Sequence, residues 1–143
     1  MDDCTAGHDV GGELALTIVR AVHEAAAGRG LRVAAVVADR AGHVVAGARM
    51  DGAPLGAMPI ATDKAHSSAL WNQSTEEIGA ISGPGQEDWG IAGAMGGRMI
   101  TFAGGVPIRR DGAQIGALGV SGARSPEDDE IARSALAALG LEA

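Results

Sequence analysis

Residues 104–122, GGVPIRRDGAQIGALGVSG, decide the fold of this chain. The pair Asp111-Gly112 is a strong hairpin signal, because a two-residue type I′ turn needs positive φ at both of its central positions. Apolar residues lie farther along the chain on both sides of the pair, at Val106 and Ile108 before it and at Ile115 and Leu118 after it. The pattern therefore predicts two strands, Val106–Arg109 and Gln114–Val120, joined as a hairpin.

The glycines of this stretch do not form a nucleotide-binding loop. A P-loop continues with Gly-Lys-Ser/Thr, and a dinucleotide fingerprint places its glycines between a strand and a helix. Gly116 and Gly119 instead fall inside a predicted strand, where glycine marks the close approach of another backbone or a ligand. Ser121 resembles a nucleophile elbow, but Ala123 stands where that motif needs glycine, and no histidine follows His66. The stretch therefore gives little support to a serine hydrolase.

The remainder of the chain alternates between helical and strand patterns. Apolar residues at three- and four-residue steps predict a helix from Glu13 to near Gly28. The other expected elements are strands at Val33–Ala38, His43–Met50 and Arg98–Phe102, a helix from near Pro59, a short helix at Ser74–Ile78 with Ser74 and Glu77 in capping-box spacing, and a helix from Ser125 to about Leu139. Residues 81–97 form a Gly-rich loop long enough to indicate a function. We expect one α+β domain over residues 1–143, with residues 1–10 disordered.

The composition argues against several classes of function. A net charge of −7 opposes phosphate backbones and anionic membranes, and an aromatic content of 2% leaves few surfaces for base stacking. The lone Cys4 excludes an internal disulfide and fits a reducing compartment. With no signal peptide and no apolar run of bilayer length, we expect a cytoplasmic protein without nucleic-acid or membrane partners. The small Ala and Gly side chains each bury little area, which predicts a homo-oligomer.

Four blocks of the sequence resemble the GlcG/HbpS family, to which the C-terminal domain of PduO-type proteins is related. They are VVADRAGHVVAGARMDGA (36–53), DKAHSSAL (63–70), PGQEDWGI (84–91) and GGVPIRRDGAQIGALGVSGARSPEDDEIARSAL (104–136). The resemblance implies a profilin-like five-stranded antiparallel sheet with packed helices, in an oligomer. It also implies haem binding, since several members bind haem and some degrade or sense it.

Two residues are candidates for holding haem. Some relatives take an iron ligand from the first helix, where this chain has His23, and an imidazole is a good ligand for haem iron. Arg49 ends a predicted strand and could grip a haem propionate or a small acidic substrate through a bidentate pair. The alternatives are a surface histidine beside Glu24 and an arginine paired with Asp51.

Three residues on the second long helix are candidate acid–base groups. Lys64 matches a Lys-Ala pair that recurs in the family, whereas relatives often have another residue in place of His66. A histidine with a carboxylate three residues earlier, here Asp63, can act as a general base near neutral pH. The same pair can equally be a solvated helix contact.

Two residues in and after the Gly-rich loop could contact a substrate. Relatives often have an aromatic residue near position 89, so Trp89 could form a pocket wall. Arg98 could bind an anion in the same way as Arg49.

The acidic run at residues 127–130, EDDE, follows Ser125 at a helix start, where negative charge stabilises the N-terminus. We interpret it as capping and expect no metal site apart from haem iron at His23.

Three functions remain open. The first is haem binding, with haem as the cofactor and breakdown or sensing as its purpose. The second is a cofactor-free enzyme of isomerase, cyclase, deaminase or hydrolase type, using Lys64, His66 and Arg49. The third is a non-catalytic oligomeric accessory protein. The first two need a pocket at a subunit seam bordered by the first two helices.

Overall fold

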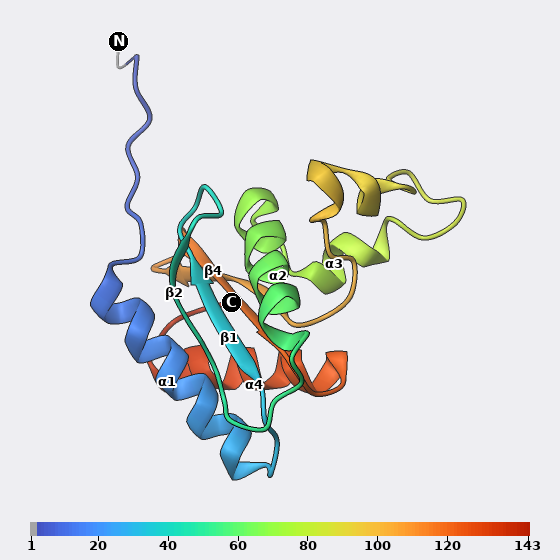
Figure 1. The fold of residues 1–143 in the computed structure, drawn as a ribbon. Helices are drawn as coiled ribbons and strands as arrows, with labels where there is room; N and C mark the ends of the chain where they lie inside the picture. The colour runs from blue at the N-terminus through green and yellow to red at the C-terminus, as the bar shows by residue number, and fades with distance from the viewer. Residues whose placement is uncertain (1–2) are drawn as a thin grey trace.

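The computed structural model describes residues 3–143 and has one antiparallel sheet covered by helices on both faces (Figure 1). Within these residues the sheet has four strands in the order β2-β1-β4-β3. The helices and strands are α1 (Gly12–Gly28), β1 (Ala34–Ala38), β2 (Val44–Arg49), α2 (Ala57–Trp71), α3 (Thr75–Ala80), β3 (Gly105–Arg110), β4 (Ala113–Ser121) and α4 (Ser125–Ala138), with two short 3₁₀ turns, η1 (Ile91–Gly93) and η2 (Met95–Gly97). The α+β class is confirmed.

The two faces of the sheet carry different helices. Val33, Val37 and Leu118 pack with α1 and α4 in the larger core, whereas Ala34 and Val36 pack under α2 in a smaller one. Successive residues of β1 serve opposite cores because side chains alternate across a strand. All five residues of β1 are buried, as expected for a central strand.

The β3–β4 hairpin forms as the sequence predicts. Asp111 and Gly112 have φ of 52° and 77°, the positive values that a type I′ turn requires. Arg110 and Ala113 close the ladder on either side of the turn.

The glycines inside β4 lie where another backbone comes close, which confirms their predicted role. A Cβ on Gly119 would collide with the carbonyl oxygen of Ala61 in α2, and one on Gly116 would collide with that of Ala38 in β1. The absence of a side chain at Gly119 lets α2 lie very close to the sheet, whereas Gly116 allows the close approach of the Ala38 carbonyl in β1.

The prediction of a fifth strand at Arg98–Phe102 is wrong. Those residues are irregular, and their polar backbone atoms bind a side chain of α2 instead of a neighbouring strand. Ile100 N donates to Ser67 Oγ at 2.9 Å, and the same hydroxyl lies 3.0 Å from the carbonyl oxygen of Arg98. A single serine thus replaces the ladder that a strand would need.

The predicted start of the short helix α3 is confirmed. α3 begins with the expected capping box, because Glu77 N donates to Ser74 Oγ and Ser74 N donates to Glu77 Oε2. The Gly-rich segment 81–97 projects from the body beside α3 (Figure 1).

The chain ends differ in how they attach to the body. The N-terminal segment runs away from the body toward its start (Figure 1), but Val10 is buried and its amide donates to Ile115 O at 2.7 Å. Attachment therefore begins inside the segment for which disorder was expected. Near the C-terminus, Glu142 forms an antiparallel bridge with Arg109 of β3.

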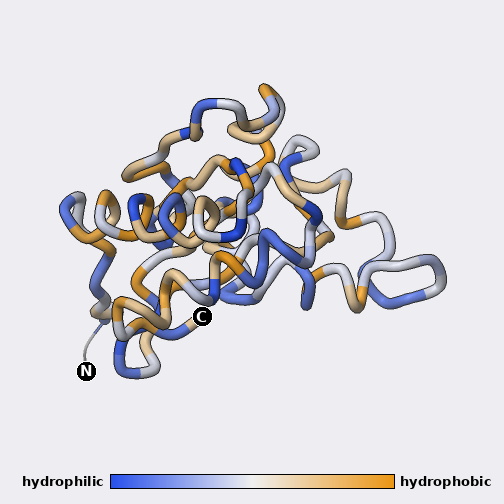
Figure 2. The backbone as a smooth tube through the Cα atoms, turned by 90° about the horizontal axis from the view of Figure 1, so that it is seen from below, coloured by the Kyte–Doolittle hydropathy of each residue, from blue (hydrophilic) through white to orange (hydrophobic). Residues whose placement is uncertain are grey.

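No helix in residues 3–143 is both long and apolar enough to cross a membrane. Figure 2 shows hydrophobic and hydrophilic residues interleaved along the helices, as packing on one side of a sheet requires.

Candidate functional site

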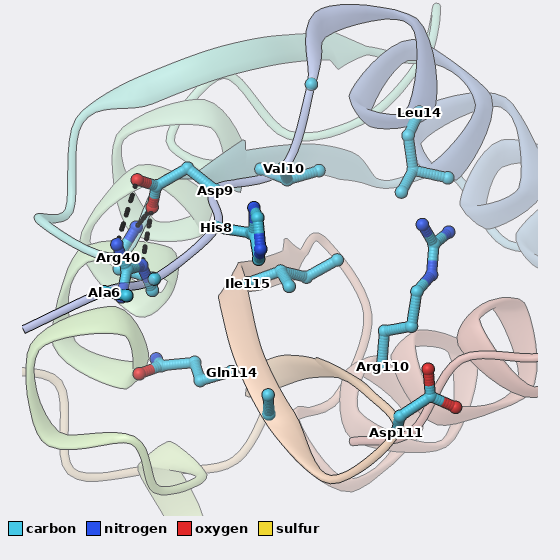
Figure 3. Close-up of a pocket in the computed structure, with 13 residues that line it drawn as sticks. Ala6, His8, Asp9, Val10, Leu14, Arg40, Arg110, Asp111, Gln114 and Ile115 are labelled. Carbon is cyan, nitrogen blue, oxygen red and sulfur yellow. Dashed lines mark hydrogen bonds and ion pairs between the residues drawn. The ribbon is translucent and has the colours of Figure 1, made fainter.

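A groove of about 880 Å³ lies between the N-terminal segment and the β3–β4 hairpin (Figure 3). Residues 6–11 form one wall, the hairpin around Arg110 and Ile115 forms the other, and Leu14 comes from the first turn of α1. The volume falls within the roughly 300–1,000 Å³ of small-molecule sites.

The groove combines an imidazole with apolar side chains. His8, Val10, Leu14 and Ile115 all line it, and Figure 3 shows the His8 ring lying between the Asp9–Arg40 pair and Arg110. His8 is exposed, whereas Val10 and Ile115 are buried. The site therefore offers a nitrogen ligand, and the accessible apolar surface beside it comes from the half-buried Leu14 and the exposed Ala6 and Ala113.

The position of His8 is set by a strap formed by its two following residues. Arg40 Nε donates to Asp9 Oδ1 at 3.0 Å, and Arg40 N donates to the same oxygen at 2.9 Å. The side-chain hydrogen bond from Arg40 holds the pKa of Asp9 below its ordinary value. The Val10 amide donates to Ile115 O. The two residues after His8 are therefore both attached to the body of the protein, Asp9 through Arg40 and Val10 through Ile115.

The two guanidinium groups of the groove differ in their partners. Arg40 is engaged by Asp9, whereas the guanidinium of Arg110 has no hydrogen-bond or ion-pair partner anywhere in residues 3–143. Asp111 also lines the groove and forms no ion pair within that part of the chain. Arg110 is therefore the cation available to an anionic ligand.

A buried ion pair lies elsewhere, between α2 and the start of α4. Lys64 and Asp128 have side chains 1% and 2% exposed, and Lys64 Nζ donates to Asp128 Oδ2 at 3.0 Å and to Val120 O at 2.8 Å. The Lys64 ammonium lies over the Phe102 ring, with Nζ 5.3 Å from the ring centroid. Burial lowers the pKa of Lys64 and raises the pKa of Asp128, because each charged form loses hydration.

The family of the chain follows from comparison with known proteins. The family model described as "Haem degrading protein HbpS-like" matches residues 11–137. The chain belongs to the HbpS-like family.

Solved structures share the HbpS-like fold over nearly the whole chain. The Klebsiella pneumoniae protein ORFY is 31% identical with a TM-score of 0.93, covering 98% of this chain and 97% of its own. A structure of the PduOC:haem complex is 29% identical with a TM-score of 0.87, covering 93% of this chain and 96% of its own.

The HbpS-like chain is also similar to part of a longer protein. It is 34% identical over 93 residues to the corrinoid adenosyltransferase PduO of Salmonella typhimurium. That match covers 65% of this chain but spans only 28% of the length of PduO.

In this HbpS-like chain, the residues expected to hold haem lie outside the groove. His23 is half-buried on α1, and its Nε2 lies 3.2 Å from the carbonyl oxygen of Ala48 in β2. Arg49 is exposed at the end of β2. The structure brings neither residue to His8.

The three expected acid–base residues lie on one helix but do not form one site. Lys64 is taken up by its buried pair with Asp128, whereas Asp63 accepts from Arg98 Nε at 2.9 Å. His66 Nδ1 lies 3.4 Å from Gly42 O, and its buried Nε2 has no hydrogen-bond partner in the described chain. The geometry therefore gives no support to the acid–base enzyme.

The other expected substrate contacts are dispersed. Trp89 lies in the projecting loop with 70% of its surface exposed, and Arg98 is bound to Asp63. Neither residue lines the groove.

The carboxylates at the start of α4 form hydrogen bonds and ion pairs with other groups of the protein. Glu127 Oε1 accepts from Arg124 N, Asp128 Oδ1 accepts from Ala123 N, and Asp129 pairs with Arg133 at 2.7 Å. Across residues 3–143, no group of three or more His, Cys, Asp or Glu side chains lies close enough together to hold a metal ion. The capping interpretation agrees with the contacts of Glu127 and Asp128.

Sequence reasoning missed His8 and Arg110. The sequence pattern places His8 in the segment 1–10 that is expected to be disordered, and it gives Arg110 no role. A weak signal was present, since Val10 is a lone apolar residue between the polar segment and Gly11. An isolated apolar residue there is consistent with an anchoring contact.

Proposed function

We propose that this HbpS-like protein binds haem in the groove beside the β3–β4 hairpin. The observation that carries the proposal is the His8 imidazole in an open groove with apolar walls and an unpaired guanidinium. A solved relative of 29% identity is a haem complex. Membership of a family described as haem degrading points to the same ligand.

The residues of the groove fit the chemistry of haem. The half-buried Leu14 and the exposed Ala6 and Ala113 would cover part of the porphyrin face, and burial of apolar surface is worth about 25 cal/mol per Å². His8 would supply the nitrogen ligand, and bound haem would supply an iron centre able to carry redox chemistry. The strap between Asp9 and Arg40 would hold the histidine in place.

His8 is a better candidate ligand than His23. The Nε2 of His23 lies against the Ala48 carbonyl, so a neutral ring there holds its proton on Nε2 and its lone pair on Nδ1. Binding of iron at Nε2 would require that contact to break. His8 forms no side-chain hydrogen bond within residues 3–143 and needs no such change.

Haem titration followed by the Soret band tests the proposal. We expect His8→Ala to change the Soret band and weaken haem binding by at least the roughly tenfold that even outer-shell changes cost at metal sites. His23→Ala is the matched control and should titrate like the wild type. No spectral change on adding haem to the wild type would exclude haem binding, and a loss confined to His23→Ala would move the ligand to α1.

Haem breakdown is the further activity that the family description supports. It would consume the bound haem, so the Soret band should disappear after a reductant and oxygen are added, with release of free iron. A stable Soret band under those conditions would favour binding for sensing or storage.

We also propose that the protein assembles with copies of itself. α1 and α2 cover opposite faces of the sheet, so one subunit cannot form a pocket bordered by both helices. The expected seam would need α1 of one copy to meet α2 of another. Exposed apolar residues on α2, Ile60 and Trp71, support such a contact.

A further inference from the structure

We infer that Arg110 determines the specificity of the groove by binding a carboxylate of the ligand. The inference rests on the proposed haem function and names the part of haem that the groove selects. It concerns an amphiphilic ligand with an apolar ring at one end and carboxylates at the other.

The position of Arg110 follows from strand alternation. Arg109 and Arg110 are neighbours at the end of β3, so their side chains leave the sheet on opposite faces. Arg109 Nη2 donates to Asn72 O and to Asn72 Oδ1, both at 3.0 Å. Arg110 lines the groove on the other face. The first arginine is already engaged, and the second is free for a ligand.

The groove has no other unengaged guanidinium within the described chain. Arg40 donates to Asp9 through both its backbone amide and its side chain. Figure 3 shows this pair on one side of His8 and Arg110 on the other, reaching toward Leu14. A ring resting on the apolar wall near Leu14 could therefore place a carboxylate at Arg110 while His8 faces its centre.

Asp111 lowers the attraction of this site for anions. Its carboxylate lines the same groove, and Asp111 directly follows Arg110 at the hairpin turn. Two like charges brought together repel, so a carboxylate ligand must overcome the field of Asp111. Removing that charge should strengthen the binding of a carboxylate ligand.

The test compares iron protoporphyrin IX with its dimethyl ester, which keeps the ring and the iron but has no carboxylates. Dissociation constants are measured by absorbance for the wild type, Arg110→Gln, Asp111→Asn and the control Arg109→Gln. We expect Arg110→Gln to weaken binding of the free acid by roughly five- to tenfold, the range for a charge-assisted pair at an open groove. Binding of the ester should be unchanged in that variant.

The matched variants sharpen the result. Asp111→Asn should tighten binding of the free acid without affecting the ester, and Arg109→Gln should leave the preference for the free acid as in the wild type. Circular dichroism of each variant checks that it is folded. Because the Arg110 side chain is exposed and forms no hydrogen bond or ion pair with the described chain, its replacement should not disturb folding.

Two negative outcomes have different meanings. If the wild type binds neither porphyrin, both the haem proposal and this inference are overturned. If the wild type binds haem but Arg110→Gln keeps the full preference for the free acid over the ester, this inference fails and the haem proposal stands.

Discussion

Lys64 and Asp128 form a charged pair in the interior, and their environment gives them a structural role. Lys64 Nζ is shared between the Asp128 carboxylate and the Val120 carbonyl, under the Phe102 ring. Each partner is buried, so each depends on the other to offset its lost hydration. The pair ties α2 to the start of α4 and the end of β4.

Removing one partner of this pair should destabilise the fold strongly. We expect Lys64→Met to lower the free energy of unfolding by about 3–5 kcal/mol, because it leaves the Asp128 carboxylate buried without its cation. Urea denaturation measures the change. The control is Arg29→Met, which breaks the exposed pair with Glu130 and should cost about 0.2–1 kcal/mol.

The double variant Lys64→Met/Asp128→Asn separates charge from packing. It should lose less stability than the sum of the two single changes, since no uncompensated charge remains. Strict additivity would show that the two side chains act independently.

The Asp9–Arg40 strap should depend on pH in one direction. The side-chain hydrogen bond that Asp9 accepts from Arg40 places the pKa of Asp9 in the folded state below 3.8, the value expected in the unfolded chain. The contribution of the strap is therefore complete above pH 3.8 and is lost as pH falls through the lower folded-state value. The backbone amide signal of Arg40, which donates to Asp9 Oδ1, should report this transition in an NMR titration.

Asp9→Asn supplies the comparison for the strap. The acid transition at the Arg40 amide should vanish in this variant, while the rest of the spectrum should keep its wild-type pattern at neutral pH. A transition of Arg40 centred above pH 3.8 in the wild type would contradict the assigned direction.

At the scale of elements, α2 packs closely against β4. Ala57, Ala61 and Ala65 form the buried face of α2, and Gly119 lies opposite the Ala61 carbonyl. Small residues on both sides let a helix lie against the sheet with little side chain between them. The closeness also makes this contact intolerant of added volume.

Gly119→Ala should therefore destabilise the protein by about 1–3 kcal/mol, the usual cost of overpacking a core. The new methyl group would meet the backbone of α2 and could be accommodated only if the helix moved. Gly28→Ala is the control, since a Cβ there meets nothing within 4 Å. Thermal unfolding of both variants decides the matter, and equal melting temperatures would refute the close packing.

The elements also show why local pattern succeeded at the hairpin and failed at Arg98–Phe102. The turn at Asp111-Gly112 is governed by its own φ values, which the sequence encodes directly. The segment around Ile100 has residues suited to a strand, but Ser67 from α2 satisfies its backbone. A contact across 33 residues of sequence cannot be deduced from local periodicity.

At the scale of the whole molecule, the two sheet faces are unequally covered. α1 and α4 share one face, whereas α2 alone covers the centre of the other and presents Ile60 and Trp71 outward. Exposed apolar side chains of this size favour association with another surface.

We expect native mass spectrometry to show a multiple of the 14.2 kDa subunit mass. Ile60→Glu combined with Trp71→Glu should shift the protein toward the single-subunit mass, because two charges would be buried at the seam. The control Ser134→Glu adds a charge at an exposed position of α4, which is not one of the two helices of the expected seam, and should leave the assembly intact. A wild type found only at the single-subunit mass would contradict self-association.

The sequence by itself determined the α+β class, the hairpin, the capping box of α3 and the family, because each of these is written in local spacing or in blocks of ordered residues. Only the tertiary structure decided where the candidate site lies. His8, Arg40 and Arg110 are far apart in the chain and meet because Asp9 and Val10 attach the N-terminal segment to the sheet. It likewise decided the role of Lys64, since only folding removes water from its ammonium and brings Asp128 to it across 64 residues. Spacing along a chain records local geometry, whereas burial and long-range pairing exist only once the chain has folded.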